Sequence, residues 1–399
     1  MSARASRPFR IGVCAEAFGF GPASKAAALV HGLAQRVPTQ AIPLADSIAH
    51  EFLRREGIHG QPPLDIRTPI GQDQGRELSR GLDLALVVLI PEWVPILRPH
   101  VPVAYVDSLG FLWPRAFFDQ HPALRSVDAY LVQEVFSASA RLRSFGVQNV
   151  YEVGALVSHA SRGALTQAGD IVHLGGLLNI FSAGDGLRYT QFATRLLHGV
   201  VDAGTRVLMS EAVRATNPDT GLLVPRTLSH REVMDAFAAA TCVFTSPGMT
   251  ALLELAALRA PVVPLPPQNL SQARILTEIA RLPDMPAIWH MLADAYPVAE
   301  DVPEELGVAV VRSRNLEHAA SGSFQRSYRQ LAAAARAAAR PLPENLVRDY
   351  AGVDDCVEHI MGLLARNQGG IESLATRSTA DEQISSAERA ASLAPSVGR

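Results

Sequence analysis

Lysine is almost absent from this sequence, although alanine and arginine are abundant. The 36 lysines and arginines are outnumbered by 39 aspartates and glutamates, which leaves a formal net charge of −3. A protein that binds nucleic acid over much of its surface carries a basic excess, so the composition argues against that class. The arginine bias is typical of a GC-rich genome rather than of a basic function.

Cysteine is also scarce. Cys14, Cys242 and Cys356 lie far apart and are odd in number, which fits neither a disulfide framework nor a zinc site. Cys14 and Cys242 fall inside predicted strands, where a free cysteine is a small core residue.

Long apolar runs are missing as well. No stretch approaches the roughly 20 apolar residues that span a bilayer, and the arginines near the start precede no apolar stretch of signal-peptide length. We therefore expect a cytoplasmic protein with no stable membrane insertion. An Asp-x-Asp metal motif is absent too, and Asp354-Asp355 are adjacent.

The chain itself is long and apolar. Its 399 residues are 48% hydrophobic and 19% charged, which is enough for two ordinary globular domains with large cores. Short apolar runs alternate with helical patterns along both halves, which predicts two doubly wound, Rossmann-like α/β domains rather than repeats of a fixed period.

Residues 241–272 are the most informative stretch. Val243–Thr245 is a short β-branched run that predicts a buried strand, and a Ser-Pro-Gly turn ends it at Gly248. A helix follows, with Thr250 or Ser246 as its expected cap and Pro261 beyond its end. A second strand, Val262–Leu265, leads to a Pro-rich turn and three amides, Gln268, Asn269 and Gln272.

This order of elements carries chemistry. A helix that starts at Gly248 points free backbone N–H groups and the positive end of its dipole at the crevice above the strands. Glycine there lets a phosphate approach the backbone, and Glu254 lies about one and a half turns on, where a carboxylate accepts ribose hydroxyls. The open alternative is a plain βαβ unit in which Gly-Met-Thr is only a turn and Glu254 is solvated.

The stretch resembles the donor-binding segment of GT-B glycosyltransferases, which include plant and bacterial UDP-sugar transferases and the N-acetylglucosaminyltransferase of peptidoglycan synthesis. The resemblance implies that Gly248, Met249 and Thr250 hold the diphosphate and that Glu254 holds the ribose. One of Gln268, Asn269 and Gln272 would then hold the donor sugar. Ser246-Pro247 replaces the usual His or Gly, and Gln-Asn replaces an Asp-Gln pair, so the donor sugar stays undefined.

The first strand, Arg10–Ala15, runs into a loop that contains Gly-x-Gly but no third glycine, so it is a poor dinucleotide fingerprint. In the GT-B enzymes this loop lies under the acceptor and often carries a histidine base, and here Glu16 stands instead. A carboxylate whose pKa is raised by burial can take the acceptor proton. A solvated or Lys25-paired Glu16 is the alternative, and Ser24 and Lys25 could instead bind an anion. The expected acceptor residues are Phe18, Gly19, Phe20, Ser24 and Lys25.

Further candidates follow other strands, since ligands gather at the carboxyl ends of strands in open α/β sheets. Asp107 follows the run Val101–Val106 and, by the resemblance, would orient the base, with a turn or cap aspartate as the alternative. Gly175, Gly176 and Asn179 follow Asp170–Leu174 and, by the resemblance, would face the donor diphosphate, with a plain turn as the alternative. Arg226 lies where the family's backbone pairs with uracil. The aromatic run Phe111–Phe118 either lines the cleft or plugs the core.

The expected organisation is an acceptor-binding domain at residues 1–155, a linker at 156–169 and a donor-binding domain at 170–349. A final helix at 350–366 would cross back onto the first domain, and 367–399 would be a disordered tail. Residues 57–80 are expected to be irregular, and residues 283–314 to hold only a short strand, Val308–Val311. A helix is expected over 316–340.

The sequence thus predicts a metal-independent and inverting enzyme without a cofactor, which moves a sugar from a UDP-sugar to a small acceptor. The opening GVCAEAFGFGPASK also resembles the group that attaches glucuronate to cytosine in nucleoside-antibiotic biosynthesis, with Arg274 as a candidate for the donor carboxylate. A UDP-sugar 2-epimerase of the same fold and a non-catalytic nucleotide-sugar-binding subunit are the alternatives. A homodimer is left open, and nucleic acid is not an expected partner.

Overall fold

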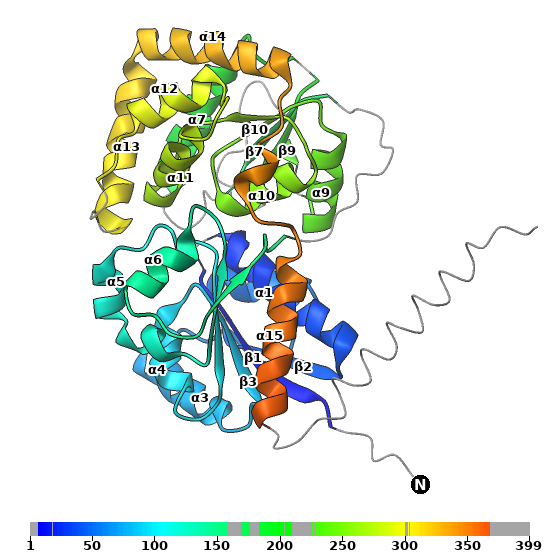
Figure 1. The fold of residues 1–399 in the computed structure, drawn as a ribbon. Helices are drawn as coiled ribbons and strands as arrows, with labels where there is room; N and C mark the ends of the chain where they lie inside the picture. Colours follow the sequence, from blue (N-terminus) through cyan, green and yellow to red (C-terminus); the bar gives the residue numbers. More distant parts are fainter. Residues whose placement is uncertain are drawn as a thin grey trace, which may run out of the picture.

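The protein is seen in a computed structural model that describes residues 7–17, 19–157, 169–175, 183–202, 204–209, 225–226, 228–299, 302 and 304–367. These residues form two lobes, each built on its own parallel β-sheet with helices around it (Figure 1). The predicted linker is described only at residues 156, 157 and 169, and the predicted tail only at Asn367, so both stay predictions.

The first lobe holds a six-stranded parallel sheet in the order β2-β1-β3-β4-β5-β6. The central strands are buried on both faces, as expected of apolar runs covered by helices. The elements are β1 Phe9–Ala15, α1 Phe20–Arg36, β2 Thr39–Pro43, α2 Ser47–Arg55, α3 Pro69–Ser79, β3 Leu84–Val88, α4 Val94–Leu97, β4 Val103–Asp107, α5 Arg115–Gln120, β5 Ala129–Gln133, α6 Ala138–Ser144 and β6 Val150–Val153.

The second lobe holds a five-stranded parallel sheet in the order β11-β10-β7-β8-β9. Its elements are β7 Ile171–Leu174, α7 Ala183–Leu197, β8 Arg206–Met209, β9 Pro225–Arg226, α9 His230–Ala239, β10 Val243–Thr245, α10 Met249–Ala257, β11 Val262–Pro264, α11 Leu270–Ala280, α12 Ala287–Ala295, α13 Glu304–Ala320 and α14 Gly322–Ala338. A capping box between Ser229 and Glu232 fixes the start of α9.

Both sheets reverse their strand order once. The chain places β2 on one side of β1 and all later strands of the first sheet on the other, so the reversal lies between β1 and β3. In the second sheet it lies between β7 and β10. Ligands of doubly wound folds bind outside the carboxyl ends of strands at such points. A ligand site is therefore expected at the carboxyl ends of β1 and β3 and of β7 and β10.

Three local predictions were wrong. Residues 57–80 contain helix α3, because Thr68 accepts a hydrogen bond from Gly71 N–H and Pro69 occupies the first turn. Val308–Val311 is not a strand but part of α13, where burial recurs at Gly307, Val311 and Asn315 with helical spacing. The single helix expected over 316–340 is divided between α13 and α14, with Ser321 as the cap of α14.

The final helix, α15 (Gly352–Asn367), lies along α1 of the first lobe, as predicted (Figure 1). Val357, Ile360 and Leu364 join the same buried cluster as Leu29 and Leu33 of α1. None of the described helices is long and apolar enough to cross a lipid bilayer.

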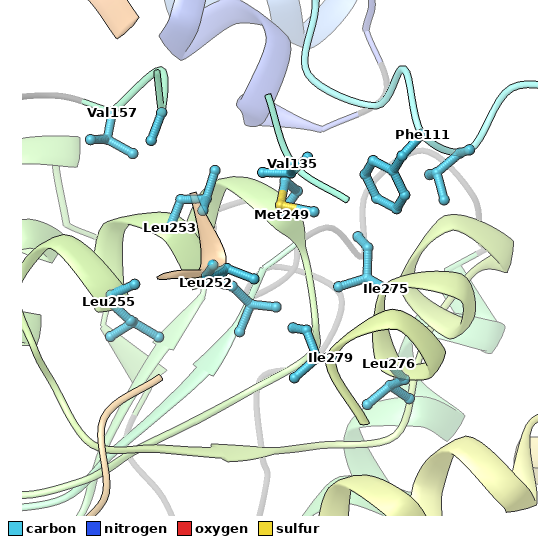
Figure 2. Packing of buried hydrophobic residues seen from close by; sticks show 14 of the residues in the cluster. Phe111, Val135, Val157, Met249, Leu252, Leu253, Leu255, Ile275, Leu276 and Ile279 are labelled. Atoms are coloured by element: carbon cyan, nitrogen blue, oxygen red, sulfur yellow. The ribbon is translucent and has the colours of Figure 1, made fainter. Parts of the chain in front are cut away.

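The two lobes also share a hydrophobic cluster. It contains Phe111 and Val135 of the first lobe together with Met249 of α10 and Ile275 of α11. Figure 2 shows Met249 beside Val135 at this junction. Because apolar side chains of both lobes are buried against each other, the lobes are held in a definite arrangement above the strand ends.

Ile360→Ala tests the packing of the crossing helix. The Ile360 side chain is fully buried, so truncation to alanine should lower the free energy of unfolding by about 2–5 kcal/mol. Chemical denaturation measures the loss. Glu358→Ala on the exposed side of the same helix should change it by less than about 0.5 kcal/mol, and equal effects of the two substitutions would contradict the packing described.

Candidate functional site

A cavity of about 1300 Å³ lies between the lobes and is lined by both of them. Each sheet contributes the residues that follow its reversal point: Glu16 and Leu89 after β1 and β3, and Gly175 and Ser246 after β7 and β10. The cavity therefore sits where two topological switch points face each other, the position at which doubly wound folds bind ligands.

The start of α10 forms part of the cavity wall. Gly248 is the N-cap residue and no side chain caps the helix, so the expected cap at Thr250 or Ser246 is wrong. Gly248 N–H donates to Ser246 O at 2.7 Å, and Leu252 N–H donates to Gly248 O at 3.0 Å. Among the described residues, none accepts a hydrogen bond from the N–H groups of 249–251. Three backbone donors and a helix dipole thus remain for an anion in the cavity.

Gly248 itself does not need the conformational freedom of glycine, because its φ is −75°. A Cβ added there would lie 3.9 Å from Gln272 Nε2 and would meet nothing closer. The missing side chain therefore leaves the approach to the free N–H groups open, as expected for a phosphate site.

Ser246 and Gln268 tie the strand ends of the second lobe together. Gln268 Nε2 donates to Ser246 Oγ at 2.8 Å and to Gly175 O at 3.0 Å. Tyr189 adds a hydroxyl contact with Ser246 at 2.8 Å. Gln268 is fully buried and does not line the cavity. The structure therefore gives Gln268 a positioning role, against the expectation that it is a candidate for the donor sugar.

The side-chain amides of Asn269 and Gln272 make different hydrogen bonds. Asn269 Oδ1 caps α11 by accepting from Gln272 N–H at 2.8 Å. Gln272 Oε1 accepts from Gln268 N–H at 2.8 Å, which turns Nε2 of Gln272 toward Gly248. Of the three amides predicted for the donor sugar, Gln272 is thus the one whose N–H donors face the anion site.

A cluster of buried charge lies beside the first turn of α10. Glu254 is 5% exposed, and its Oε1 lies 3.4 Å from His230 Nε2. Burial raises the pKa of Glu254, and His230 and Lys25 oppose the rise. Lys25 comes from α1 of the other lobe, and its ammonium donates a hydrogen bond to Thr250 Oγ1. Lys25 thus contacts α10 of the other lobe, and its expected role in acceptor binding stays a prediction.

Two histidines of the cavity wall were missed by the sequence analysis. His230 follows the N-cap Ser229 as the first residue of α9. His173 lies in β7 and is partly buried, and desolvation followed by the nearby His230 lowers its pKa to about 4. His173 Nδ1 lies 3.0 Å from Thr245 Oγ1, which itself donates to Ser246 O. The imidazole is therefore neutral, with Nε2 as an acceptor beside Gly175. The sequence did contain a signal for His173, because this histidine lies one residue before the end of a predicted strand, where ligands bind.

Glu16 lies at the carboxyl end of β1, in the part of the cavity wall that the first lobe supplies. Its N–H donates to Val88 O at 3.0 Å, which fixes the loop at the sheet edge. Burial raises the pKa of Glu16, and Arg67, whose Nη2 donates to Oε1 at 3.2 Å, opposes the rise. The alternative in which Lys25 pairs with Glu16 is wrong, because Lys25 is held at Thr250. Glu16 thus presents a carboxylate with a raised pKa to the cavity, and its role as a base stays a prediction.

Asp107 lies at the carboxyl end of β4. Its carboxylate is fully buried and does not line the cavity. It accepts hydrogen bonds from Leu109 N–H at 2.7 Å, Trp113 Nε1 at 2.9 Å and the Tyr130 hydroxyl at 2.6 Å. Three internal donors hold Asp107 in the loop after β4, and the expected role of orienting the base stays a prediction.

The aromatic run after this loop serves both expected purposes. Phe111 and Phe118 are buried in the core, whereas Trp113 and Phe117 stack at 4.4 Å and line the cavity. Phe20 of α1 also lines it, with its ring centroid 5.7 Å from that of Phe52 in α2. The first lobe thus offers an aromatic surface beside Glu16.

The other predicted residues have mixed outcomes. Gly19 lines the cavity and has a φ of 98°, which favours glycine, and Ser24 Oγ donates to Gly21 O at 3.0 Å within α1. Phe18, Gly176, Asn179 and the side chain of Arg226 lie outside the described residues.

The guanidinium of Arg274, the candidate for a sugar carboxylate, donates hydrogen bonds to backbone carbonyl groups. Its guanidinium donates to the carbonyl oxygens of Leu112 at 3.0 Å and of Ala299 and Val302 at 3.2 Å. Since Leu112 belongs to the first lobe and the other two to the second, Arg274 joins the lobes.

Neither a family model nor a curated protein matches the sequence. Solved structures do match. LpCGTa in complex with UDP has a TM-score of 0.52 at 14% identity, over 90% of this chain and 100% of that one. A UDP-glucosyltransferase from Polygonum tinctorium capable of glucosylating indoxyl has a TM-score of 0.50 at 13% identity, over 90% and 99%. The chain has the GT-B fold. At these identities the likeness concerns the fold alone.

Asp107→Asn tests the burial of this carboxyl. Burial raises the pKa of Asp107 to about 6 from 3.8, although its three donors oppose the rise. Between these values the folded state keeps a proton that the unfolded state has lost, so stability falls as pH rises from about 4 to 6. The loss is on the order of 3 kcal/mol. Melting curves should show the wild type declining relative to Asp107→Asn over this range, and parallel curves would contradict the assignment.

Proposed function

We propose that the protein is a glycosyltransferase that moves a sugar from a UDP-sugar to a small acceptor, without a metal and with inversion. The observation that carries this proposal is the set of free N–H groups at residues 249–251, which open into a cavity between two switch points. The GT-B fold supports it, because a matched structure of that fold is a UDP complex.

The donor is proposed to lie across the start of α10. Its diphosphate accepts from the N–H groups of 249–251 and from Gln272, and its ribose binds Glu254 beside His230. Backbone donors held in a cavity stabilise charge that develops on a leaving group without reorganising. The sugar then lies toward Glu16, in the first lobe's part of the cavity wall.

In the proposed reaction, an acceptor O–H or N–H attacks the anomeric carbon from the side opposite the diphosphate. The bond between that carbon and the diphosphate oxygen breaks, and the oxygen keeps the electron pair. Glu16 takes the acceptor proton, for which a raised carboxyl pKa is suited. One displacement inverts the anomeric centre.

The acceptor is proposed to be a planar molecule, because the wall near Glu16 carries Phe20, Trp113 and Phe117. The finer proposal of glucuronate transfer to a cytosine-type base rests on Glu16, since a carboxylate base suits a ring nitrogen. Arg274 no longer supports it, because its donors are taken by carbonyl groups.

Gly248→Ala tests the diphosphate site. The new Cβ has room in the fold, with its nearest neighbour at 3.9 Å, so the fold should persist. The Cβ stands over the free N–H groups, and the Kd for UDP should rise at least about tenfold, which is about 1.4 kcal/mol. Calorimetry measures it. Gly322→Ala at the exposed start of α14 is the matched control. Unchanged UDP binding by Gly248→Ala would refute the site.

Turnover is tested with UDP-glucose, UDP-N-acetylglucosamine and UDP-glucuronate, each with cytosine and with planar phenols, and product is read by mass spectrometry. We expect UDP release only with acceptor present and no loss of activity in EDTA. Conversion of a UDP-sugar without acceptor would indicate the epimerase, and binding without turnover of any pair would indicate a non-catalytic subunit.

Glu16→Gln assigns the base in the same assay. Without the carboxylate the acceptor proton has no base, so turnover should fall by about 10²–10⁴-fold. The Kd for UDP should be unchanged, because Glu16 lies in the part of the cavity wall that the first lobe supplies. A Glu16→Gln enzyme with wild-type turnover would rule out this role.

A further inference from the structure

Lys25 is the only lysine of the 399-residue chain, and every other basic residue among the 36 lysines and arginines is an arginine. The exposed cations of this protein are therefore arginines, whereas Lys25 is 3% exposed in α1. An ammonium group is a compact point charge with three donors, and arginine cannot replace it in a narrow space. The single lysine thus places a compact charge in the interior of the protein.

The Lys25 ammonium is incompletely paired. Its hydrogen bond goes to Thr250 Oγ1 in the first turn of α10, and among the described residues no carboxylate lies within 4.0 Å of it. Glu254 attracts it from further away, but that carboxylate is also shared with His230. Burial lowers the pKa of Lys25 to about 8, which Glu254 opposes. Within the described part of the chain, two of its three donors have no acceptor. A buried cation in that state costs stability unless a ligand supplies the missing acceptors.

The location of this cation is specific. A Cβ on Gly21 of α1 would lie 2.9 Å from Thr250 Oγ1 and 4.0 Å from Lys25 Nζ, so the starts of α1 and α10 meet here. Both helices line the cavity. Lys25 therefore reaches from the first lobe to the turn whose N–H groups are free.

We propose that Lys25 completes the diphosphate site from the opposite lobe, so that the donor's diphosphate is bound jointly by α10 and by Lys25. This rests on the proposed function and deepens it. As the bond to the anomeric carbon breaks, the electron pair stays on the diphosphate oxygen, the new bond forms to the acceptor, and the acceptor proton goes to Glu16. The Lys25 ammonium and the α10 N–H groups face the growing charge. Lys25 is then a catalytic residue, and donor binding fastens the two lobes together.

Calorimetry of Lys25→Met with UDP, uridine and inorganic pyrophosphate tests this. Methionine keeps the apolar stem and removes the charge. The Kd for UDP should rise at least about tenfold, which is about 1.4 kcal/mol, and that for uridine should change less than about twofold. Arg76→Met removes a charge from exposed α3, outside the cavity, and should leave both constants unchanged.

A purely structural role predicts different results. If Lys25 only links the lobes through Thr250, Lys25→Met should melt at a lower temperature while UDP and uridine binding change equally. We expect instead that ligand-free Lys25→Met melts at or above the wild-type temperature and loses most of the stabilisation by UDP. Lys25→Gln, which keeps a donor for Thr250, should show the same selective loss.

The outcomes separate this inference from the proposed function. Unchanged UDP affinity in both Lys25 variants would overturn the inference and leave the transferase proposal standing. A wild type that binds pyrophosphate through Lys25 but no UDP compound would keep the anion site and overturn the transferase. A wild type that binds neither ligand would overturn both.

Discussion

The first turn of α10 has backbone donors that nothing in the described protein satisfies, and the function depends on this constraint. Three N–H groups at residues 249–251 lie at the wall of a cavity rather than at an exposed helix end. Ser246, Tyr189 and Gln268 hold the preceding turn in place. Because these donors are fixed before any ligand arrives, the protein needs little reorganisation to bind an anion there.

The arrangement of the lobes makes the site a shared one. Apolar contacts such as Met249 with Val135 hold α10 against the first lobe (Figure 2), and Arg274 donates to carbonyl groups of both lobes. The first lobe thereby brings Glu16 and an aromatic surface to face the second. Under the proposed function, the second lobe supplies the backbone N–H donors of α10, and the first lobe supplies Lys25 and the proposed base Glu16.

The fold could largely be predicted from the sequence, because strands buried on both faces leave continuous apolar runs such as Leu84–Val88. Local capping chemistry was equally readable at Ser229. Helix α13 was not predicted, since its valines favour a strand while its burial follows helical spacing. Helix α3 was hidden by glycine and proline, although Thr68-Pro69 was a start signal.

The site was only partly predictable. Order along the chain placed Gly248 and Glu16 after strand ends and Glu254 on the helix after Gly248, and these positions line the cavity. Side-chain partners come from distant segments, so the sequence could not show that Tyr130 and Trp113 donate hydrogen bonds to the Asp107 carboxylate. For the same reason, the contact between Lys25 and Thr250, which are 225 residues apart, was not foreseen.

A crystal structure with UDP tests the central claim most directly. The account predicts diphosphate oxygens at roughly 2.7–3.2 Å from the backbone nitrogens of the first turn of α10, with the ribose toward Glu254. A UDP molecule bound with its diphosphate away from that turn, or outside the cavity between the lobes, would contradict it.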